Sequence, residues 1–176
     1  MSIKTEFSHP ILAVETFPVA GPDRIHRFLR IRTSDWVNCI PITADRNVIL
    51  VRQHRHGIDE VTLEIPGGAI DAGEEAATAA RRELVEETGF EGGHLVDLGW
   101  VWSNPAIQNN RTHFFVIDGV KPTGTIQPDP TEDIEVVQVP LAEVPALLAT
   151  GQIRHALAVA ALQRAMLRGL IPLPPA

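Results

Sequence analysis

Apolar and polar residues alternate along the first third of the chain. The alternation is clearest over residues 24–32, and similar segments recur between residues 11 and 53. Successive side chains of a strand point to opposite faces of a sheet, so a period of two predicts β-strands. Turn signals at residues 21–22 and 45–47 punctuate the pattern. The expected strands are residues 11–19, 24–32, 36–43 and 47–53.

The middle of the chain changes from a strand to a helix. A short strand is expected over residues 61–68, where Pro66-Gly67-Gly68 stops it. A helix follows from about Glu74 to Thr88, and Gly89 stands at the position where helices commonly end in the left-handed conformation. Leu84 and the alanines at 76, 79 and 80 can face the core from this helix.

Strands resume after this helix, and helices finish the chain. A loop is expected over residues 121–133, which are rich in proline and contain a glycine. This order predicts one α/β domain in which helices cover a mixed sheet. The remaining elements are strands at residues 94–102, 111–119 and 134–139 and helices at residues 141–150 and 153–168.

Composition is that of an ordinary globular protein. The 176 residues are 44% hydrophobic and 21% charged, which suits one domain with room for a small appendage. No apolar run reaches the roughly 18 residues that a membrane span needs, and residues 1–17 lack the features of a secretory signal. Cys39 is the single cysteine, which excludes an intramolecular disulfide and suits a reducing compartment. We therefore expect a cytoplasmic protein that does not cross a membrane.

The charge balance limits the partners of the protein. A net charge of -7 argues against binding to nucleic acid, which requires a basic face. Acidic clusters nevertheless serve phosphate chemistry when Mg²⁺ or Mn²⁺ lies between the two negative groups.

Three carboxylates share one face of the expected helix. Glu86 and Glu87 follow Glu83 by three and four residues, which places their Cβ atoms about 5–6 Å apart. Like charges at this spacing repel, and a divalent cation with oxygen ligands is a natural neutraliser. Arg82 could hold one carboxylate in a fixed orientation. A solvated acidic helix face is the alternative interpretation.

The acidic helix belongs to a longer pattern of fixed spacing. It reads Gly68, five residues, Glu74, seven residues, Arg82-Glu83-Leu84, one residue, Glu86-Glu87, one residue, Gly89-Phe90. This pattern resembles the Nudix box at every fixed position. The resemblance implies a Nudix α/β/α sandwich with a mixed β-sheet, and divalent-metal-dependent hydrolysis of a nucleoside diphosphate linked to another moiety.

The same resemblance implies roles for individual residues. Glu83 and Glu87 are the expected main metal ligands, Glu86 is a further ligand or a water-orienting group, and the carbonyl of Gly67 is a backbone ligand. Glu74 and Arg82 are the expected ion-pairing supports of the loop and helix. Glycine at 67 and 68 lets the backbone approach an ion or phosphate closely.

Segments outside the box resemble the branch of ADP-ribose pyrophosphatases and nucleotide-sugar hydrolases, over roughly residues 36–165. Residues 48–57 and 62–68 are similar to its Arg-Gln-x-Arg and Glu-x-Pro-Gly-Gly elements, and residues 131–162 to its carboxyl-terminal part. The implied substrate is a nucleoside diphosphate joined to a sugar. ADP-ribose is one example, and GDP-mannose stays open because residues 103–106 read Ser-Asn-Pro-Ala where the branch often has Ser-Pro-Gly.

Candidate substrate contacts follow from the same elements. Arg55 resembles the arginine of the branch that contacts phosphate, and its guanidinium suits a diphosphate. Arg52 is a second candidate, with a solvated strand residue as the alternative. Trp36, Trp100 and Trp102 could stack on a base, although a tryptophan in a strand often belongs to the core.

The general base is expected in the loop before the last strand. Glu132 occupies the position that matches the branch, with Asp133 and Glu135 as alternatives. Local spacing does not choose among the three, and an acidic surface loop is the other interpretation.

Two broader expectations come from the branch. Residues 1–35 suit a strand region that forms a homodimer, and residues 36–176 would form the Nudix hydrolase domain. The rival functions are a Nudix domain that senses a nucleotide sugar without cleaving it, and a nucleoside triphosphatase or RNA 5′-end pyrophosphohydrolase.

Overall fold

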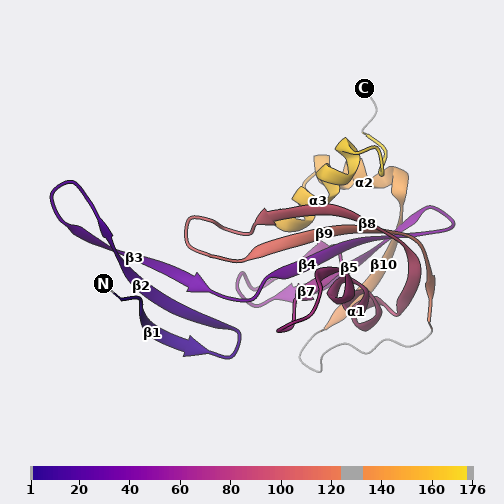
Figure 1. Cartoon of the computed structure of the whole chain (residues 1–176). Helices are drawn as coiled ribbons and strands as arrows, with labels where there is room; N and C mark the ends of the chain where they lie inside the picture. The colour runs from indigo at the N-terminus through magenta and orange to yellow at the C-terminus, as the bar shows by residue number, and fades with distance from the viewer. Residues whose placement is uncertain (1, 124–132, 174–176) are drawn as a thin grey trace.

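The computed structural model describes residues 2–123 and 133–173. Figure 1 shows a body built around a β-sheet and a long arm of strands that projects from one side of it. The arm is the amino-terminal part of the chain, and the carboxyl-terminal helices lie on the body.

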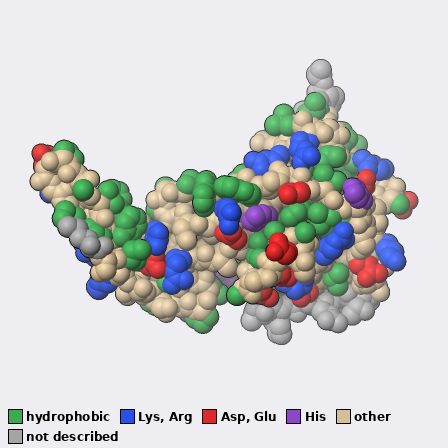
Figure 2. Space-filling model, viewed as in Figure 1, with side chains coloured by type: hydrophobic (Ala, Val, Ile, Leu, Met, Phe, Trp, Pro, Cys, Tyr) green, Lys and Arg blue, Asp and Glu red, His purple; other side chains and the backbone are tan. Residues whose placement is uncertain are grey.

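The arm is an antiparallel sheet with the strand order β1-β2-β3. Its strands are Lys4–His9 (β1), Leu12–Ala20 (β2) and Ile25–Arg32 (β3). Apolar side chains are exposed along the arm (Figure 2), among them Phe7, Ile11 and Phe28. The sequence pattern did not predict β1, because every residue of this strand is exposed and no buried face imposes a period of two.

The root of the arm is fastened to the loop of residues 103–110. The backbone N–H of Ile31 donates to the carbonyl of Ile107 at 2.7 Å, and that of Thr33 donates to Asn109 Oδ1 at 3.3 Å. Arg111 then pairs with Asp35 at 3.0 Å. These contacts join the arm to the body just before the first strand of the large sheet.

The body contains a mixed sheet of seven strands. Its order is β10-β5-β4-β9-β8, with β6 paired to β5 and β7 paired to β4. Strands β4 and β9 run parallel, whereas the other pairs are antiparallel. The strands are Trp36–Thr43 (β4), Asn47–Arg55 (β5), Glu60–Glu64 (β6), Gly67–Ala69 (β7), Phe90–Trp102 (β8), Arg111–Pro122 (β9) and Ile134–Pro140 (β10).

Helices cover both faces of this sheet, as the resemblance to the Nudix box implied. Alternate residues of the central strands enter two separate cores, so Ile40 packs on the side of α3 and Cys39 on the side of α1. Figure 1 shows α2 and α3 on one side of the sheet and α1 on the other. The helices are Ala76–Thr88 (α1), Val144–Ala149 (α2) and Ala156–Leu167 (α3), with a 3₁₀ turn at Leu141–Glu143 (η1). The fold is therefore an α/β/α sandwich.

Two boundaries near the acidic helix differ from the prediction. The strand expected over residues 61–68 is two strands, because the chain leaves β5 and joins β4 at Ile65-Pro66. Helix α1 begins at Ala76 instead of Glu74, and Gly89 ends it with a φ of 67° as expected. The carboxylate of Glu74 accepts hydrogen bonds from the Asp71 N–H and from Arg82, which holds this residue in the preceding loop.

The carboxyl-terminal helices are shorter than predicted. The segment expected as one helix at residues 141–150 divides into η1 and α2, with Pro145 in the first turn of α2. Helix α3 begins at Ala156, because Ile153 is buried in the core from the loop that precedes it. No helix within residues 2–123 and 133–173 is long and apolar enough to cross a membrane.

The packing of α1 against the sheet gives a stability prediction. Leu84 in α1 is 1% exposed, whereas Leu167 in α3 is 84% exposed. We expect Leu84→Ala to lower the free energy of unfolding by about 2–5 kcal/mol, because it leaves a cavity in the core. Leu167→Ala, the matched control, should change it by about 0.5 kcal/mol or less. Urea denaturation of both variants measures the difference, and equal effects would contradict this packing.

Candidate active site

Strand β7 presents bare backbone to helix α1. It runs antiparallel to β4, with Gly67 opposite Asn38 and Gly68 opposite Val37. A Cβ atom on Gly67 would lie 2.8 Å from the Cα of Asn38, and one on Gly68 would lie 2.6 Å from the carboxylate carbon of Glu83. Position 67 therefore requires glycine because the clash is with the backbone of β4, whereas a side chain at position 68 would displace the carboxylate of Glu83.

The carboxylates of α1 differ in their surroundings. Glu87 is buried, and its Oε2 accepts a hydrogen bond from the Gly67 N–H at 2.9 Å. The side chain of Glu83 is 12% exposed and lies against Gly68, whereas that of Glu86 is 42% exposed. Two carboxylates thus face β7, and the third faces solvent.

Arg82 connects this acidic face to the loop before the helix. Its Nε and Nη2 donate to Glu74 at 3.0 and 2.9 Å, and its Nη1 donates to Glu83 at 2.8 Å and to Glu86 at 3.0 Å. A further bond from Nη2 reaches the carbonyl of Ala69 at 3.0 Å. The hydrogen bonds to Glu74 raise the pKa of Arg82, and Arg82 in turn lowers the pKa of Glu74. Both groups therefore stay charged at neutral pH.

Cys39 lies in the core behind these carboxylates. Burial raises the pKa of its thiol well above the usual value, and the charges of Glu87 and Glu83 raise it further. The negative charges of both carboxylates are therefore felt at the same buried position, the Cys39 thiol. The thiol stays protonated at neutral pH and behaves as a small apolar group.

The acidic face fits a hard cation by the type of its donors. Mg²⁺ and Mn²⁺ prefer carboxylate and carbonyl oxygens, which α1 and β7 supply. In the part of the chain that the structure describes, however, no three His, Cys, Asp or Glu side chains form a group that could hold a metal ion. Arg82 engages Glu83 and Glu86, and the Gly67 N–H engages Glu87. These hydrogen bonds engage one oxygen of each carboxylate, so an ion held here would share the carboxylates with protein donors.

A cavity of ≈ 270 Å³ lies beside β7. Its size is close to the lower end of the range for small-molecule sites, about 300 Å³. Trp36 and Arg55, two residues singled out from the sequence, share its wall with Gly67 and Gly68. The other lining residues are Val37, Asn38, Ala69, His155 and Leu157.

Arg55 is held by a carboxylate that the sequence analysis did not single out. Glu64, at the end of β6, is 0% exposed and accepts hydrogen bonds from Arg55 Nε at 2.9 Å and Nη2 at 2.7 Å. The hydroxyl of Thr62 also donates to Glu64, and His155 Nδ1 lies 3.3 Å from Glu64 Oε2. Burial works to raise the pKa of Glu64, but the hydrogen bonds from Arg55 and Thr62 outweigh it and the pKa is lowered.

Sequence reasoning could have found Glu64 but had no signal for His155. Glu64 is the first residue of the Glu-x-Pro-Gly-Gly element that was recognised. His155 reaches the cavity because α3 packs across the sheet, and that arrangement leaves no local pattern in the chain.

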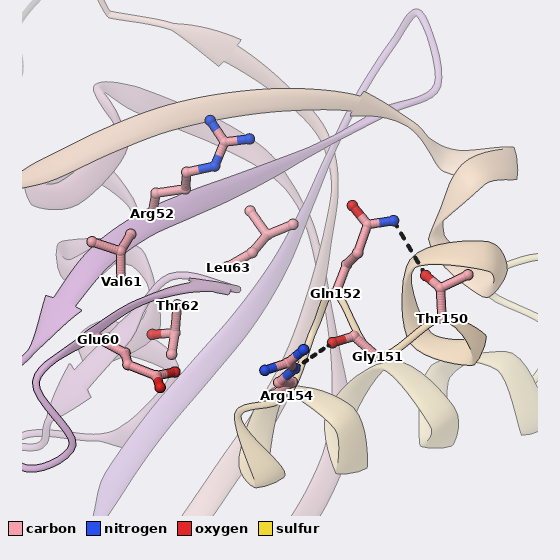
Figure 3. A pocket seen from close by; sticks show the side chains of 9 residues that line it. All are labelled: Arg52, Glu60, Val61, Thr62, Leu63, Thr150, Gly151, Gln152 and Arg154. Carbon is pink, nitrogen blue, oxygen red and sulfur yellow. Dashed lines mark hydrogen bonds between the residues drawn. The ribbon is translucent and has the colours of Figure 1, made fainter.

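The structure does not bring Arg52 to this cavity. Arg52 lies on β5 three residues before Arg55, and its Nη1 lies 3.1 Å from Glu135 Oε1 and 3.2 Å from Glu135 Oε2. It lines a different cavity, of ≈ 280 Å³, together with the segment between α2 and α3 (Figure 3). Residues at an odd spacing in a strand point to opposite faces, which explains why the two arginines separate.

The candidates for the general base are only partly visible. Glu132 lies outside the described residues. Asp133 is exposed at the start of the last strand, and Glu135 on β10 is engaged by Arg52. The structure therefore leaves the choice among the three where the sequence left it.

Comparisons with known proteins agree with this geometry. The family model described as NUDIX domain matches residues 34–162. The chain is 30% identical over 142 residues to ADP compounds hydrolase NudE of Escherichia coli strain K12, which covers 81% of this chain and 75% of that protein. It is 27% identical over 133 residues to ADP-ribose pyrophosphatase of Bacillus subtilis strain 168, which covers 75% of this chain and 72% of that protein.

A solved structure shows the same fold. The crystal structure of an ADP compounds hydrolase superposes with a TM-score of 0.84 at 26% identity, and the match covers 97% of this chain and 95% of that one. The acidic pattern, the sandwich fold and the matched family model lead to one conclusion: the chain belongs to the NUDIX domain family.

Proposed function

We propose that the protein is a divalent-metal-dependent pyrophosphatase. It hydrolyses ADP-ribose or a related nucleoside diphosphate sugar to a nucleoside monophosphate and a sugar phosphate. The observation that carries this proposal is that the acidic face of α1 lies on the backbone of β7, whose glycines also line the cavity that contains Arg55. The names of the relatives, an ADP-ribose pyrophosphatase and an ADP compounds hydrolase, support the substrate class.

The acidic face would hold the cation. Glu83 and Glu87 are the proposed main ligands, with Glu86 as a further ligand and the Gly67 carbonyl as a backbone ligand. When bound, Mg²⁺ or Mn²⁺ neutralises phosphate charge and activates a water molecule. Arg82 and Glu74 keep the loop and the helix together through their ion pair of 2.9 Å.

The cavity would hold the substrate. Arg55 binds the diphosphate, because its guanidinium presents a planar fork of donors to phosphate oxygens. Trp36, from the same wall, offers an aromatic surface to the base or a sugar. The oxygen of water forms a bond to one phosphorus, and the bridging P–O bond breaks to give two phosphate monoesters. Glu132 is the proposed general base that accepts the proton of the water, with Asp133 and Glu135 as alternatives.

A domain that senses a nucleotide sugar without cleaving it is the rival function. The complete set of Glu83, Glu86 and Glu87 argues against it, because a domain that only binds its ligand has no need of all three metal ligands. Product analysis separates the two functions.

We further propose that residues 1–35 form a homodimer contact and that residues 36–176 form the hydrolase domain. Exposed apolar residues on both faces of the arm support this proposal, because a solvated sheet of this kind is otherwise prone to association. We place the protein in the cytoplasm, where its one cysteine, the buried Cys39, would stay reduced.

The first test is product analysis by chromatography. Purified protein is incubated with ADP-ribose, GDP-mannose, UDP-glucose and a nucleoside triphosphate, each with Mg²⁺ and with a chelator. We expect release of a nucleoside monophosphate and a sugar phosphate from a sugar nucleotide, and loss of this activity with the chelator. Cleavage of the triphosphate alone would indicate the rival enzyme class, and no cleavage of any compound would indicate the sensor.

Substitutions on α1 test the metal site. Glu83→Gln and Glu87→Gln should each lower kcat by about 10²- to 10³-fold, as expected when a group that supports transition-state charge is lost. They should also reduce the rise in melting temperature that Mg²⁺ or Mn²⁺ gives the native protein, since a ligand stabilises the state that binds it. Glu75→Gln, an exposed change beside the helix start, is the control. Unchanged turnover in the first two variants would exclude this metal site.

Substitutions on the arm test the dimer. Phe28 and Leu29 are both exposed and point to opposite faces of β3. We expect the protein to have the mass of a dimer by light scattering, and at least one of Phe28→Asp and Leu29→Asp to shift it to the monomer. Asp118→Asn, an exposed position on β9 outside the arm, should leave the mass unchanged. A native protein with the mass of a monomer would refute the proposal.

A further inference from the structure

The buried carboxylate of Glu64 joins three elements beside the cavity. Arg55 comes from β5, Thr62 from β6 and His155 from the residue before α3. A fully buried carboxylate is costly unless charges and hydrogen bonds compensate it. Two of its partners, Arg55 and His155, also line the cavity next to Gly67. Glu64 therefore acts on the wall of the cavity without reaching it.

The contact with Arg55 fixes the direction of the guanidinium. Nε and Nη2 donate side by side to the two oxygens of Glu64, at 2.9 and 2.7 Å. This paired geometry sets the plane of the group, whereas a single bond would allow rotation. The side chain of Arg55 remains 37% exposed, and the exposed part belongs to the cavity wall. Arg55 is thus oriented before a ligand arrives.

His155 lies beside the same carboxylate. Its buried Nδ1 is 3.3 Å from Glu64 Oε2 but makes no hydrogen bond there, and the side chain as a whole is 31% exposed. The exposed part of the ring therefore lies away from Nδ1, and Nε2 is the polar atom that remains for a ligand. Burial lowers the pKa of His155, although the charge of Glu64 opposes the effect.

The nearness of Nδ1 to the negative charge of Glu64 favours one tautomer and, with it, one kind of ligand group. A neutral imidazole that carries its proton on Nδ1 has a lone pair on Nε2. Such a nitrogen accepts a hydrogen bond from a hydroxyl, and it offers no proton to a phosphate oxygen. The sugar of a nucleoside diphosphate sugar supplies hydroxyls close to the diphosphate, which places both kinds of group within one small cavity.

We propose that Glu64 is a positioning residue for Arg55 and His155, and that His155 Nε2 binds a hydroxyl of the sugar attached to the diphosphate. This inference rests on the proposed function, because it takes the ligand of Arg55 to be the diphosphate of a nucleotide sugar. It adds a residue that distinguishes a sugar nucleotide from a plain nucleoside diphosphate.

Binding measurements test the role of His155. The probes are two analogues, one of ADP-ribose and one of ADP, in which a methylene group replaces the bridging oxygen of the diphosphate. Each is titrated into the protein in the presence of Mg²⁺ in a calorimeter. We expect His155→Leu to weaken binding of the ADP-ribose analogue by about 5- to 10-fold, which corresponds to the loss of one hydrogen bond. The affinity for the ADP analogue should stay unchanged. His155→Gln should restore most of the affinity, because its amide can accept in place of Nε2. Equal effects on both analogues, or none, would overturn the assignment.

A double-mutant cycle tests the role of Glu64. Glu64→Gln and Arg55→Lys should each raise KM more than they lower kcat, and the loss in the double variant should be smaller than the sum of the two single losses, because part of the effect of Glu64 acts through Arg55. Additive losses would show that Glu64 does not act through Arg55. Asp118→Asn, which alters the Arg46–Asp118 pair of 3.5 Å at the far end of β4, is the control.

A milder variant covers the case in which Glu64→Gln does not fold. Thr62→Val removes one hydrogen bond to Glu64 and leaves the charge pair, so it should shift KM in the same direction by a smaller factor. A lower melting temperature with unchanged KM would make the network purely structural and overturn the proposal. If the native protein bound neither analogue, the substrate class itself would fail. If it bound both and the variants matched it, only the present inference would fail.

Discussion

The close approach of helix α1 to the backbone of β7 is the constraint on which the site depends. A single methyl group on Gly68 would collide with the carboxylate of Glu83, and one on Gly67 would collide with β4. Because β7 has no side chains at these positions, acidic residues can lie on a strand that also borders a cavity. The alanines and Leu84, which lie on the same side of α1 as Glu83 and Glu87, anchor the helix in the core. A side chain at Gly67 would force β7 and β4 apart, and one at Gly68 would displace the carboxylate of Glu83.

The sequence predicted what depends on local spacing. The acidic face of α1 and its end at Gly89 follow from local spacing, the order of elements predicted a mixed sheet covered by helices, and the α/β/α sandwich was implied by the resemblance to the Nudix box. Contacts between distant segments could not be predicted in this way. His155 lies beside Glu64 only because α3 crosses the sheet, and no local sequence pattern in either segment predicts this contact. Trp100 and Trp102 show the reverse, since their strand suggested burial and they are 43% and 50% exposed on the edge strand β8.

Two signs of charge meet across β7. The carboxylates of α1 lie on one side, and the guanidinium of Arg55 lies in the cavity wall on the other. A diphosphate in the cavity would meet Arg55, and a metal ion held by the carboxylates would add a second positive charge to the site. The net charge of -7 is therefore no obstacle to an anionic substrate, because charge acts locally in a site of this kind. Arg82 holds the acidic residues together in the absence of a metal ion through its ion pairs with Glu74, Glu83 and Glu86.

Cys39 gives this arrangement a natural chemical reporter. It is the only thiol in the chain, it is fully buried, and it lies on the face of β4 that α1 covers. An alkylating reagent needs both access and a thiolate, and the closed site denies it both. The rate at which Cys39 is alkylated would therefore report how often the protein opens around α1 and exposes the thiol. Alkylation of Cys39 would thus measure the opening of the acidic face in the native protein, with no introduced label.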